Sequence, residues 1–146
     1  MEGLRGAGRV HFIGQVEEVG DETSRIRIFP EYAKGLYKLE DYSHIIVLYW
    51  LHLRDNEKDR SVLRVIPRAH EGAPEVGVFS SRSPSRPNPI GLCVVKLARI
   101  EKNILTVEGL DALVGSPIVD IKPYLPRAEM VADAKVPQWA ERGPRT

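Results

Sequence analysis

The stretch HIIVLYWLHL at residues 44–53 is apolar on both faces and rich in β-branched and aromatic side chains. Such a run predicts a strand that is buried on both sides, at the centre of a sheet or barrel. Side chains alternate along a strand, so His44 and His52 are expected at the two ends of one face. The charged segment at residues 54–60 that follows is expected to be a loop.

Shorter strand patterns lie on both sides of this run. Residues 25–29 alternate arginine with isoleucine, which is the period of a half-buried strand. Further strands are predicted at residues 10–16, 61–66, 77–80, 91–100, 104–107 and 117–121, with turns or short helical segments at 30–36, 38–42 and 136–143. No stretch sustains a helical period of 3.6 residues. The chain is therefore predicted to be an all-β, mainly antiparallel barrel or sandwich with short helical turns.

The length of the chain fits one hydrophobic core. Its 146 residues predict a single domain, with the core at about residues 10–126 and a C-terminal tail at 127–146. The formal net charge is only +1, so the total charge does not indicate a strongly basic nucleic-acid-binding protein. A local basic patch is compatible with this balance, and basic residues gather at Arg54, Lys58, Arg60, Arg64, Arg68 and His70. The acidic residues between them also allow a solvated surface of mixed charge.

Cysteine and histidine content limits the chemistry. Cys93 is the only cysteine, which excludes an intrachain disulfide and a cysteine-rich zinc site and favours a reducing compartment. Its apolar surroundings favour a small buried side chain over a nucleophile. The four histidines lack zinc-ligand spacing, so no metal is expected. The chain shows no signal-peptide pattern, and its longest apolar run, residues 45–51, is too short to span a bilayer, so a cytoplasmic protein without a membrane partner is expected.

The stretch RSPSRPNPIG at residues 82–91 places three prolines between two strand-like runs. Prolines lack a backbone donor and push the preceding residues toward extended conformations, so the segment predicts a stiff loop. The loop offers Arg82, Arg86 and Asn88 as donors for a phosphate, a carboxylate or a base edge. Two other interpretations stay open: a rigid turn with solvated arginines, and a proline-rich ligand for an SH3-type domain.

The longer motif GVFSSRSPSRPNPIGL at residues 77–92 resembles the signature of the TsaA-like (TrmO) family of S-adenosylmethionine-dependent tRNA methyltransferases. Further landmarks follow the family order, with HFIGQV at 11–16, LEDYSHIIVLYWLH at 39–52 and GLDALVGSPIVDIKPYLP at 109–126. The resemblance implies a compact single β-barrel, S-adenosylmethionine as the cofactor, a homodimer, and a tRNA anticodon loop as partner. The implied reaction is methyl transfer to N6 of threonylcarbamoyl-adenosine, the modified base beside the anticodon of some tRNAs.

The resemblance also implies site residues, position by position. Those expected to contact the cofactor are His52, Arg82, Leu92, Glu108, Gly109, Leu110 and Asp111, and those expected at the substrate side or the pocket rim are Arg86, Asn88, Lys122 and Tyr124. Residue chemistry agrees in part, because Asp111 suits a ribose hydroxyl or the donor's ammonium, and Arg82 suits the donor's carboxylate. Asp111 is also open to capping a turn. No catalytic base is identified, and Asp111 and His52 are the candidates.

The sequence departs from larger family members in two places. In larger members, the loop after the first strand helps to hold the cofactor, and the corresponding segment at residues 16–24 is much shorter. In addition, no C-terminal extension domain is expected after residue 126. Two rival functions therefore stay open. One is a non-catalytic barrel that binds S-adenosylmethionine or RNA, and the other is a methyltransferase that acts on a small molecule.

Overall fold

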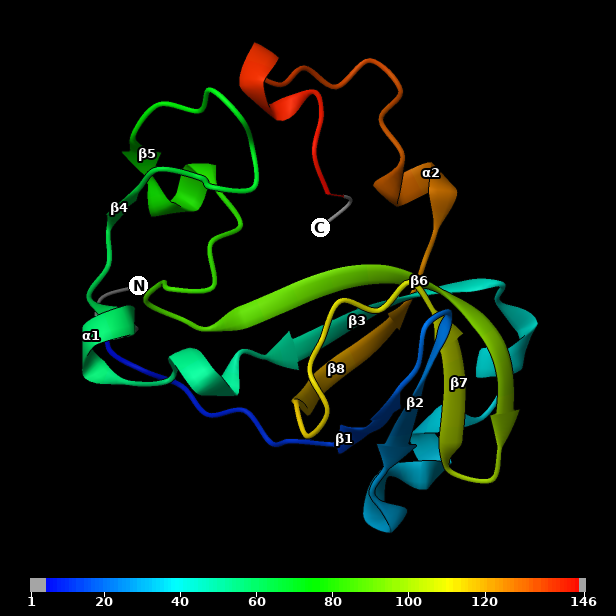
Figure 1. The fold of residues 1–146 in the computed structure, drawn as a ribbon. Helices are drawn as coiled ribbons and strands as arrows, with labels where there is room; N and C mark the ends of the chain where they lie inside the picture. The colour runs from blue at the N-terminus through cyan, green and yellow to red at the C-terminus, as the bar shows by residue number, and fades with distance from the viewer. Residues whose placement is uncertain (1–4, 145–146) are drawn as a thin grey trace.

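Six antiparallel strands close into a barrel in the computed structural model, which describes residues 5–144 (Figure 1). The strands are β1 (Gly14–Val19), β2 (Thr23–Ile28), β3 (His44–Trp50), β6 (Ile90–Glu101), β7 (Ile104–Glu108) and β8 (Pro117–Pro123). Around the barrel they follow the order β1, β2, β7, β6, β3, β8, and each neighbouring pair is antiparallel. The prediction of an all-β, mainly antiparallel barrel is confirmed.

The interior of the barrel is filled by alternate side chains of these strands. Ile26, Val47, Leu105 and Val107 have no exposed surface, and Cys93 in β6 belongs to the same cluster. The expectation that Cys93 is a small buried side chain is confirmed.

β3 pairs with β6 on one side and with β8 on the other, and consecutive residues at its centre are buried, as predicted for a strand covered on both faces. The strand ends at Trp50, however, and His52 begins a 3₁₀ turn. The two histidines therefore do not share a strand face. The Leu51 N–H donates to the Pro89 carbonyl at 2.7 Å, and Pro89 has no N–H to donate in return, so the regular ladder stops here.

Residues 51–89 leave the barrel and form a loop-rich lobe between β3 and β6 (Figure 1). The lobe contains η3 (His52–Arg54), α1 (Glu57–Arg60), a small sheet of β4 (Arg64–Val65) and β5 (Val76–Gly77), and η4 (Val78–Ser80). The strands predicted at 61–66 and 77–80 are wrong in extent. Leu63 and Ile66 stay mostly exposed, so the first segment lacks the covering layer of a longer strand. In the second, the Ser81 N–H and hydroxyl both donate to the Val78 carbonyl and close a 3₁₀ turn.

The other helical segments are single turns or little more: η1 (Pro30–Leu36), η2 (Leu39–Asp41), α2 (Pro126–Glu129) and η5 (Gln138–Ala140). The turns predicted near 30–36, 38–42 and 136–143 are confirmed, and Trp139 is half-buried in the last of them. The first strand begins at Gly14, later than predicted, because its pairing with β2 starts at Gly14–Ile28. Among residues 5–144, no helix combines the length and apolar character needed to cross a bilayer.

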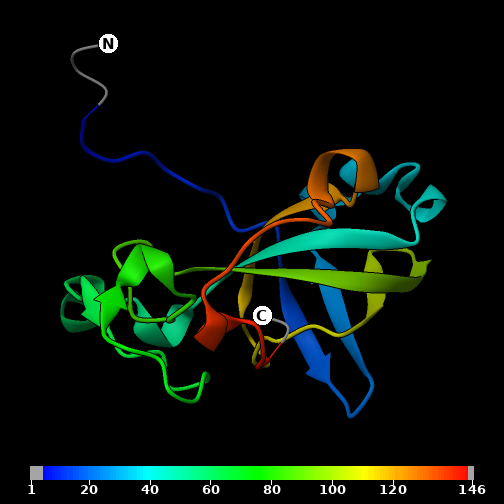
Figure 2. The ribbon, with the colours of Figure 1, turned by 90° about the horizontal axis from the view of Figure 1, so that it is seen from above.

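The tail after β8 returns to the lobe. From α2 the chain runs back across the molecule, and η5 lies beside the segment that carries β4 and β5 (Figure 2). The rings of Trp139 and His70 meet at this point, with centroids 5.5 Å apart. The tail thus connects the far end of the barrel with the lobe.

Gly91 in β6 faces the ring of Tyr49 across the β3–β6 ladder, where an added Cβ would lie 2.5 Å from the Tyr49 Cζ. We expect Gly91→Ala to lower the free energy of unfolding by about 1–3 kcal/mol through overpacking, as measured by urea denaturation. Gly77→Ala is the matched control, because a Cβ there meets no atom of residues 5–144 within 4 Å. Equal stability of the two variants would contradict the tight contact.

Candidate functional site

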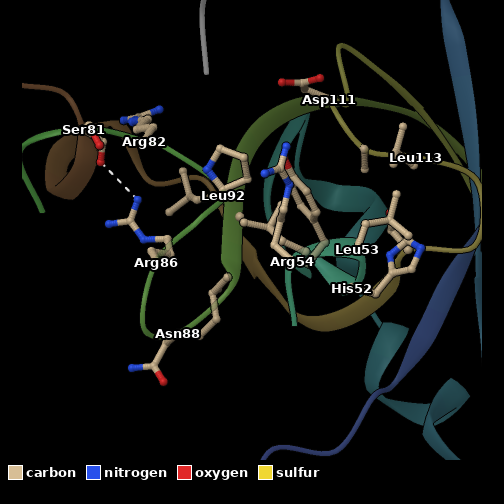
Figure 3. A pocket seen from close by; sticks show the side chains of 17 residues that line it. His52, Leu53, Arg54, Ser81, Arg82, Arg86, Asn88, Leu92, Asp111 and Leu113 are labelled. Carbon is tan, nitrogen blue, oxygen red and sulfur yellow. Dashed lines mark hydrogen bonds between the residues drawn. The ribbon is translucent and has the colours of Figure 1, made fainter. Parts of the chain in front are cut away.

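A cavity of about 700 Å³ opens where β3 and β6 leave the barrel (Figure 3). Four segments line it: the end of β3 with η3, the loop at residues 81–88, the start of β6, and residues 111–116 between β7 and β8. Its apolar lining includes Leu51, Leu53, Ile90, Leu92, Ala112 and Leu113. This volume, with apolar walls and a few polar groups, is typical of a small-molecule site.

Arg86 holds the proline-rich loop in shape. Its Nη1 donates to the carbonyl oxygens of Ser81 and Ser83, both at 3.1 Å, and the bond to Ser81 is drawn in Figure 3. The Ser83 hydroxyl in turn accepts from the Ser85 N–H at 3.3 Å. Arg86 therefore lines the cavity with a side chain that is already engaged within its own loop.

Asp59 ties this loop to the helical turn α1. Its Oδ1 accepts from the Ser85 hydroxyl at 2.5 Å, and its Oδ2 accepts from the Asn56 side-chain amide at 2.7 Å. Arg54 Nη1 donates to the Ser85 hydroxyl at 3.0 Å and lies 3.4 Å from Asp59 Oδ1. Asn56 also caps α1 by accepting from the Asp59 backbone N–H at 2.8 Å. These hydrogen bonds lower the pKa of the Asp59 carboxyl below its usual value of 3.8. The bond from Ser85 has the largest effect, and the bond from Asn56 the next largest.

Asp55 forms a second tie. Its Oδ1 accepts from Arg60 Nε at 2.7 Å, and its Oδ2 accepts from Trp50 Nε1 at 3.1 Å. Arg60 also donates to the Pro87 carbonyl at 3.1 Å and lies over the Trp50 ring, 5.6 Å from its centroid. Both hydrogen bonds lower the pKa of the Asp55 carboxyl, and the bond from Arg60 has the larger effect. Residues 54–60, expected to be a charged loop, thus contain the helical turn α1 (Glu57–Arg60), and their charged side chains hold the wall of the cavity in place.

Two other charged residues that line the cavity, Arg82 and Asp111, take no part in the hydrogen bonds and ion pairs described for Asp55 and Asp59. Arg82 is exposed, and its guanidinium has no hydrogen-bond or ion-pair partner among the described residues. Asp111 is also exposed and comes from the segment that follows β7 (Figure 3). The cavity therefore offers one cationic and one anionic group beside its apolar walls.

Tyr49 lines the cavity from β3 as a neutral phenol. The pKa of Tyr49 is raised to about 12, chiefly because the phenol is buried. The electrostatic effects of Asp111 and, less strongly, of Cys93 also contribute to this rise. Its hydroxyl can donate a hydrogen bond at neutral pH, but it is not available as a general base.

The structure brings six of the sequence-predicted site residues to this cavity: His52, Arg82, Arg86, Asn88, Leu92 and Asp111. Glu108, Gly109 and Leu110 lead into the lining segment without lining the cavity themselves. Glu108 pairs with Lys96 at 3.6 Å, the Gly109 carbonyl accepts from the Cys93 thiol at 3.1 Å, and Leu110 packs on the barrel core. These three residues hold the segment that presents Asp111.

Lys122 and Tyr124 are not brought to the cavity. Lys122 is paired with Ile46 in the β3–β8 ladder and lies 3.0 Å from Asp120. The Tyr124 N–H donates to the His44 carbonyl, and the two rings meet at 6.5 Å. His44 is the first residue of β3, whereas the cavity lies at the other end of the strand, where Tyr49 lines it. Lys122 and Tyr124 are therefore at the opposite end of the strand from the cavity.

Several lining residues were not predicted from the sequence: Leu51, Leu53, Arg54, Ala112, Leu113 and Ser116. They are near neighbours in the chain of His52 and Asp111, so extending those two segments would have found most of them. Within residues 5–144, no group of three or more His, Cys, Asp or Glu side chains could hold a metal ion.

A profile of the family described as the tRNA-methyltransferase O N-terminal domain matches residues 14–130. The chain belongs to this family. The family resemblance of the proline-rich motif is thereby confirmed. An Archaeoglobus fulgidus protein named "S-adenosyl-L-methionine-binding protein" is 53% identical over 111 residues, which cover 76% of this chain and 76% of that protein.

Solved structures named TrmO share the fold. TrmO from Pseudomonas aeruginosa matches with a TM-score of 0.70 at 28% identity, over 92% of this chain and 62% of that chain. Another TrmO structure matches with a TM-score of 0.71 at 31% identity, over 90% of this chain and 64% of that chain. The chain thus spans less than two thirds of the length of these solved TrmO chains.

Acid is expected to weaken the tie at Asp59. Because the pKa of this carboxyl is lower in the folded protein than in the unfolded chain, its contribution to stability is present above the unfolded value and is lost as pH falls through the folded value. The difference in unfolding free energy between the wild type and Asp59→Asn should be constant from about pH 7 to about pH 5 and shrink below about pH 4. Urea denaturation across this range measures it.

Ser85→Ala removes the hydrogen bond that contributes most to the lowered pKa, so it should flatten the same pH dependence. A difference between wild type and Asp59→Asn that grows on acidification would contradict the tie.

Proposed function

We propose that this protein is an S-adenosylmethionine-dependent methyltransferase that modifies N6 of threonylcarbamoyl-adenosine beside the tRNA anticodon. One observation carries the proposal. In a chain of the tRNA-methyltransferase O family, an apolar cavity of about 700 Å³ presents Arg82, whose guanidinium has no partner among the described residues, together with the exposed Asp111.

The cavity suits S-adenosylmethionine in size and in chemistry. Its volume lies within the range of roughly 300–1,000 Å³ that is typical of small-molecule sites. The apolar side chains Leu92 and Leu113 suit the faces of the adenine ring, and Asp111 suits a ribose hydroxyl or the ammonium group. Arg82 suits the carboxylate, because a guanidinium binds a carboxylate with two parallel hydrogen bonds. The name of the Archaeoglobus relative supports the same ligand.

When bound, S-adenosylmethionine would supply a methyl group on a sulfonium sulfur, which keeps the electron pair of the broken C–S bond as the new N–C bond forms. The chain's main task is then to hold both reactants in line, which contributes on the order of 7–11 kcal/mol in well-oriented reactions. The tied loop at residues 81–88 serves this task because it presents Arg82 on a fixed backbone. Partly buried apolar residues of the lining, such as Leu51 and Ala112, would limit the access of water to the reacting groups.

The acceptor nitrogen carries a proton that must leave. This nitrogen is amide-like and a poor nucleophile, so a base or a group that stabilises its deprotonated form would help. Apart from the arginines, the titratable residues that line the cavity are Tyr49, His52 and Asp111. The pKa of Tyr49, raised to about 12, removes it as a base, which leaves His52 and Asp111.

Contact with the RNA backbone is proposed for only part of the basic cluster predicted at residues 54–70. Three of its arginines already pair with acids: Arg54 with Asp59, Arg60 with Asp55, and Arg64 with Glu75. The side chains of Lys58 and Arg68 have no such partner among the described residues and are the proposed phosphate contacts. The homodimer and the cytoplasmic location stay predictions.

A second candidate function is binding of S-adenosylmethionine without methyl transfer. The name of the Archaeoglobus relative mentions binding and no reaction, and this chain spans only 62% and 64% of the two TrmO chains. Methylation of a small molecule instead of tRNA is the third. Donor binding is common to all three, so it is measured first.

Isothermal titration calorimetry with S-adenosylmethionine tests the donor site. We expect Arg82→Ala to raise the Kd about 10- to 100-fold, because a hydrogen bond to a charged group contributes about 1.5–3 kcal/mol. Arg127→Ala, at an exposed position in α2, is the matched control and should leave the Kd unchanged. If the wild type shows no measurable binding of S-adenosylmethionine, all three candidate functions are contradicted, because each of them requires the donor to bind.

Mass spectrometry of tRNA nucleosides from a strain that lacks the gene tests the acceptor. The N6-methylated form of threonylcarbamoyl-adenosine should disappear and return when the gene is restored. If that nucleoside persists in the deletion strain while the purified protein binds the donor, tRNA is the wrong acceptor.

A further inference from the structure

A second cavity, of about 480 Å³, lies beside the first, between the lobe and the tail. Ser81 and Arg82 line both cavities, so the two adjoin at the start of the proline-rich loop. Ring side chains from three separate segments line the second cavity: His70, Phe79 and Trp139. Apart from Arg82, none of the predicted site residues lines it.

Phe79 is an exposed ring on a fixed backbone. It is 79% exposed, which leaves most of an apolar side chain in water. Its neighbour Val78 is only 1% exposed and anchors η4, and the Ser81 hydroxyl closes the turn by donating to the Val78 carbonyl at 2.9 Å. The ring is thus held at the cavity by its turn, with its faces open to another planar group.

The tail supplies another wall, and it is fastened in place. His70 Nδ1 donates to the Arg142 carbonyl at 2.7 Å, and the His70 and Trp139 ring centroids are 5.5 Å apart. Gly143 has a φ of +130°, and an added Cβ would lie 2.7 Å from His70 Nδ1. Only glycine fits this position without strain, so the tail is seated closely against the lobe.

We propose that the second cavity holds the planar heteroaromatic base of the methyl acceptor, stacked on Phe79, while the first cavity holds the methyl donor. This inference rests on the proposed function and adds to it a subsite for the acceptor. Aromatic rings accept any base, because every base has a π-face. Arg82 stands where the two cavities meet, so its guanidinium can bind a carboxylate or phosphate on either side. The tail and the lobe thereby bring the acceptor next to the donor.

The test compares Phe79→Ala with the wild type in two binding assays. One assay uses fluorescence anisotropy with an anticodon stem-loop RNA that carries threonylcarbamoyl-adenosine, and the other uses calorimetry with S-adenosylmethionine. We expect the Kd for the RNA to rise on the order of 10- to 100-fold, the size of one lost base stack, while the Kd for the donor stays the same. Phe79→Tyr keeps the ring and should bind the RNA as the wild type does.

Tyr37→Ala is the matched control, because Tyr37 is 81% exposed and lies after η1, outside both cavities. It should change neither Kd. Gly143→Ala tests the tail wall independently: it should displace the tail from His70 and weaken RNA binding while donor binding persists.

The outcomes separate the subsite from the proposed function. If Phe79→Ala binds the RNA as tightly as the wild type while the donor binds normally, the subsite is overturned and the proposed function stands. If Tyr37→Ala weakens RNA binding as much as Phe79→Ala, the subsite is likewise overturned. If the wild type binds no donor, the proposed function fails first and the subsite fails with it.

Discussion

The pairing of β3 with β6 is the constraint on which the rest of the structure depends. Every residue of β3 has a partner in β6, from His44–Lys96 to Trp50–Ile90, and the Leu51–Pro89 hydrogen bond continues the contact beyond the ladder. The chain that leaves β3 and the chain that enters β6 therefore lie side by side at one end of the barrel. These two segments, η3 and the proline-rich loop, form adjacent walls of the cavity. The barrel acts as the scaffold, and the connections at its end carry the chemistry.

Polar ties turn this adjacency into a fixed wall. Asp59 holds Ser85, and Asp55 holds Arg60, which in turn holds the Pro87 carbonyl. Prolines in the same loop reduce the freedom of the unfolded chain, so less entropy is lost when the loop is ordered. A loop held in this way can present Arg82 to a ligand without first being ordered by that ligand. The same loop separates the two cavities and places Arg82 at their junction.

The parts of the fold that depend on local sequence could be predicted. β3 follows from its continuous apolar run, and the stiff loop follows from three prolines in six residues, 84–89. The loop motif also identified the family and, through it, six of the residues that line the cavity. His52 and Asp111 were predicted because they belong to long motifs of the family. Their neighbours in those motifs, such as Leu51 and Ala112, could have been predicted as lining residues for the same reason.

The parts that depend on register and on distant contacts could not be predicted. Lys122 and Tyr124 lie far from the cavity because the β3–β8 register pairs Lys122 with Ile46, near the start of β3. Nothing local in the sequence indicates that register. The hydrogen bond between Asp59 and Ser85 joins residues 26 positions apart, so the alternating charges around Asp59 suggested a solvated surface instead. The second cavity needs the tail to return to His70, which no pattern in the tail indicates.

The most direct measurement is a methyl-transfer reaction with the purified protein, S-adenosylmethionine and an anticodon stem-loop that carries threonylcarbamoyl-adenosine. Mass spectrometry of the released nucleosides should show one added methyl group on that base. It should show none when plain adenosine stands at the same position. Stoichiometric binding of the donor without any methylated nucleoside, under conditions in which the stem-loop also binds, would contradict the central claim that this cavity positions a methyl donor for transfer to tRNA.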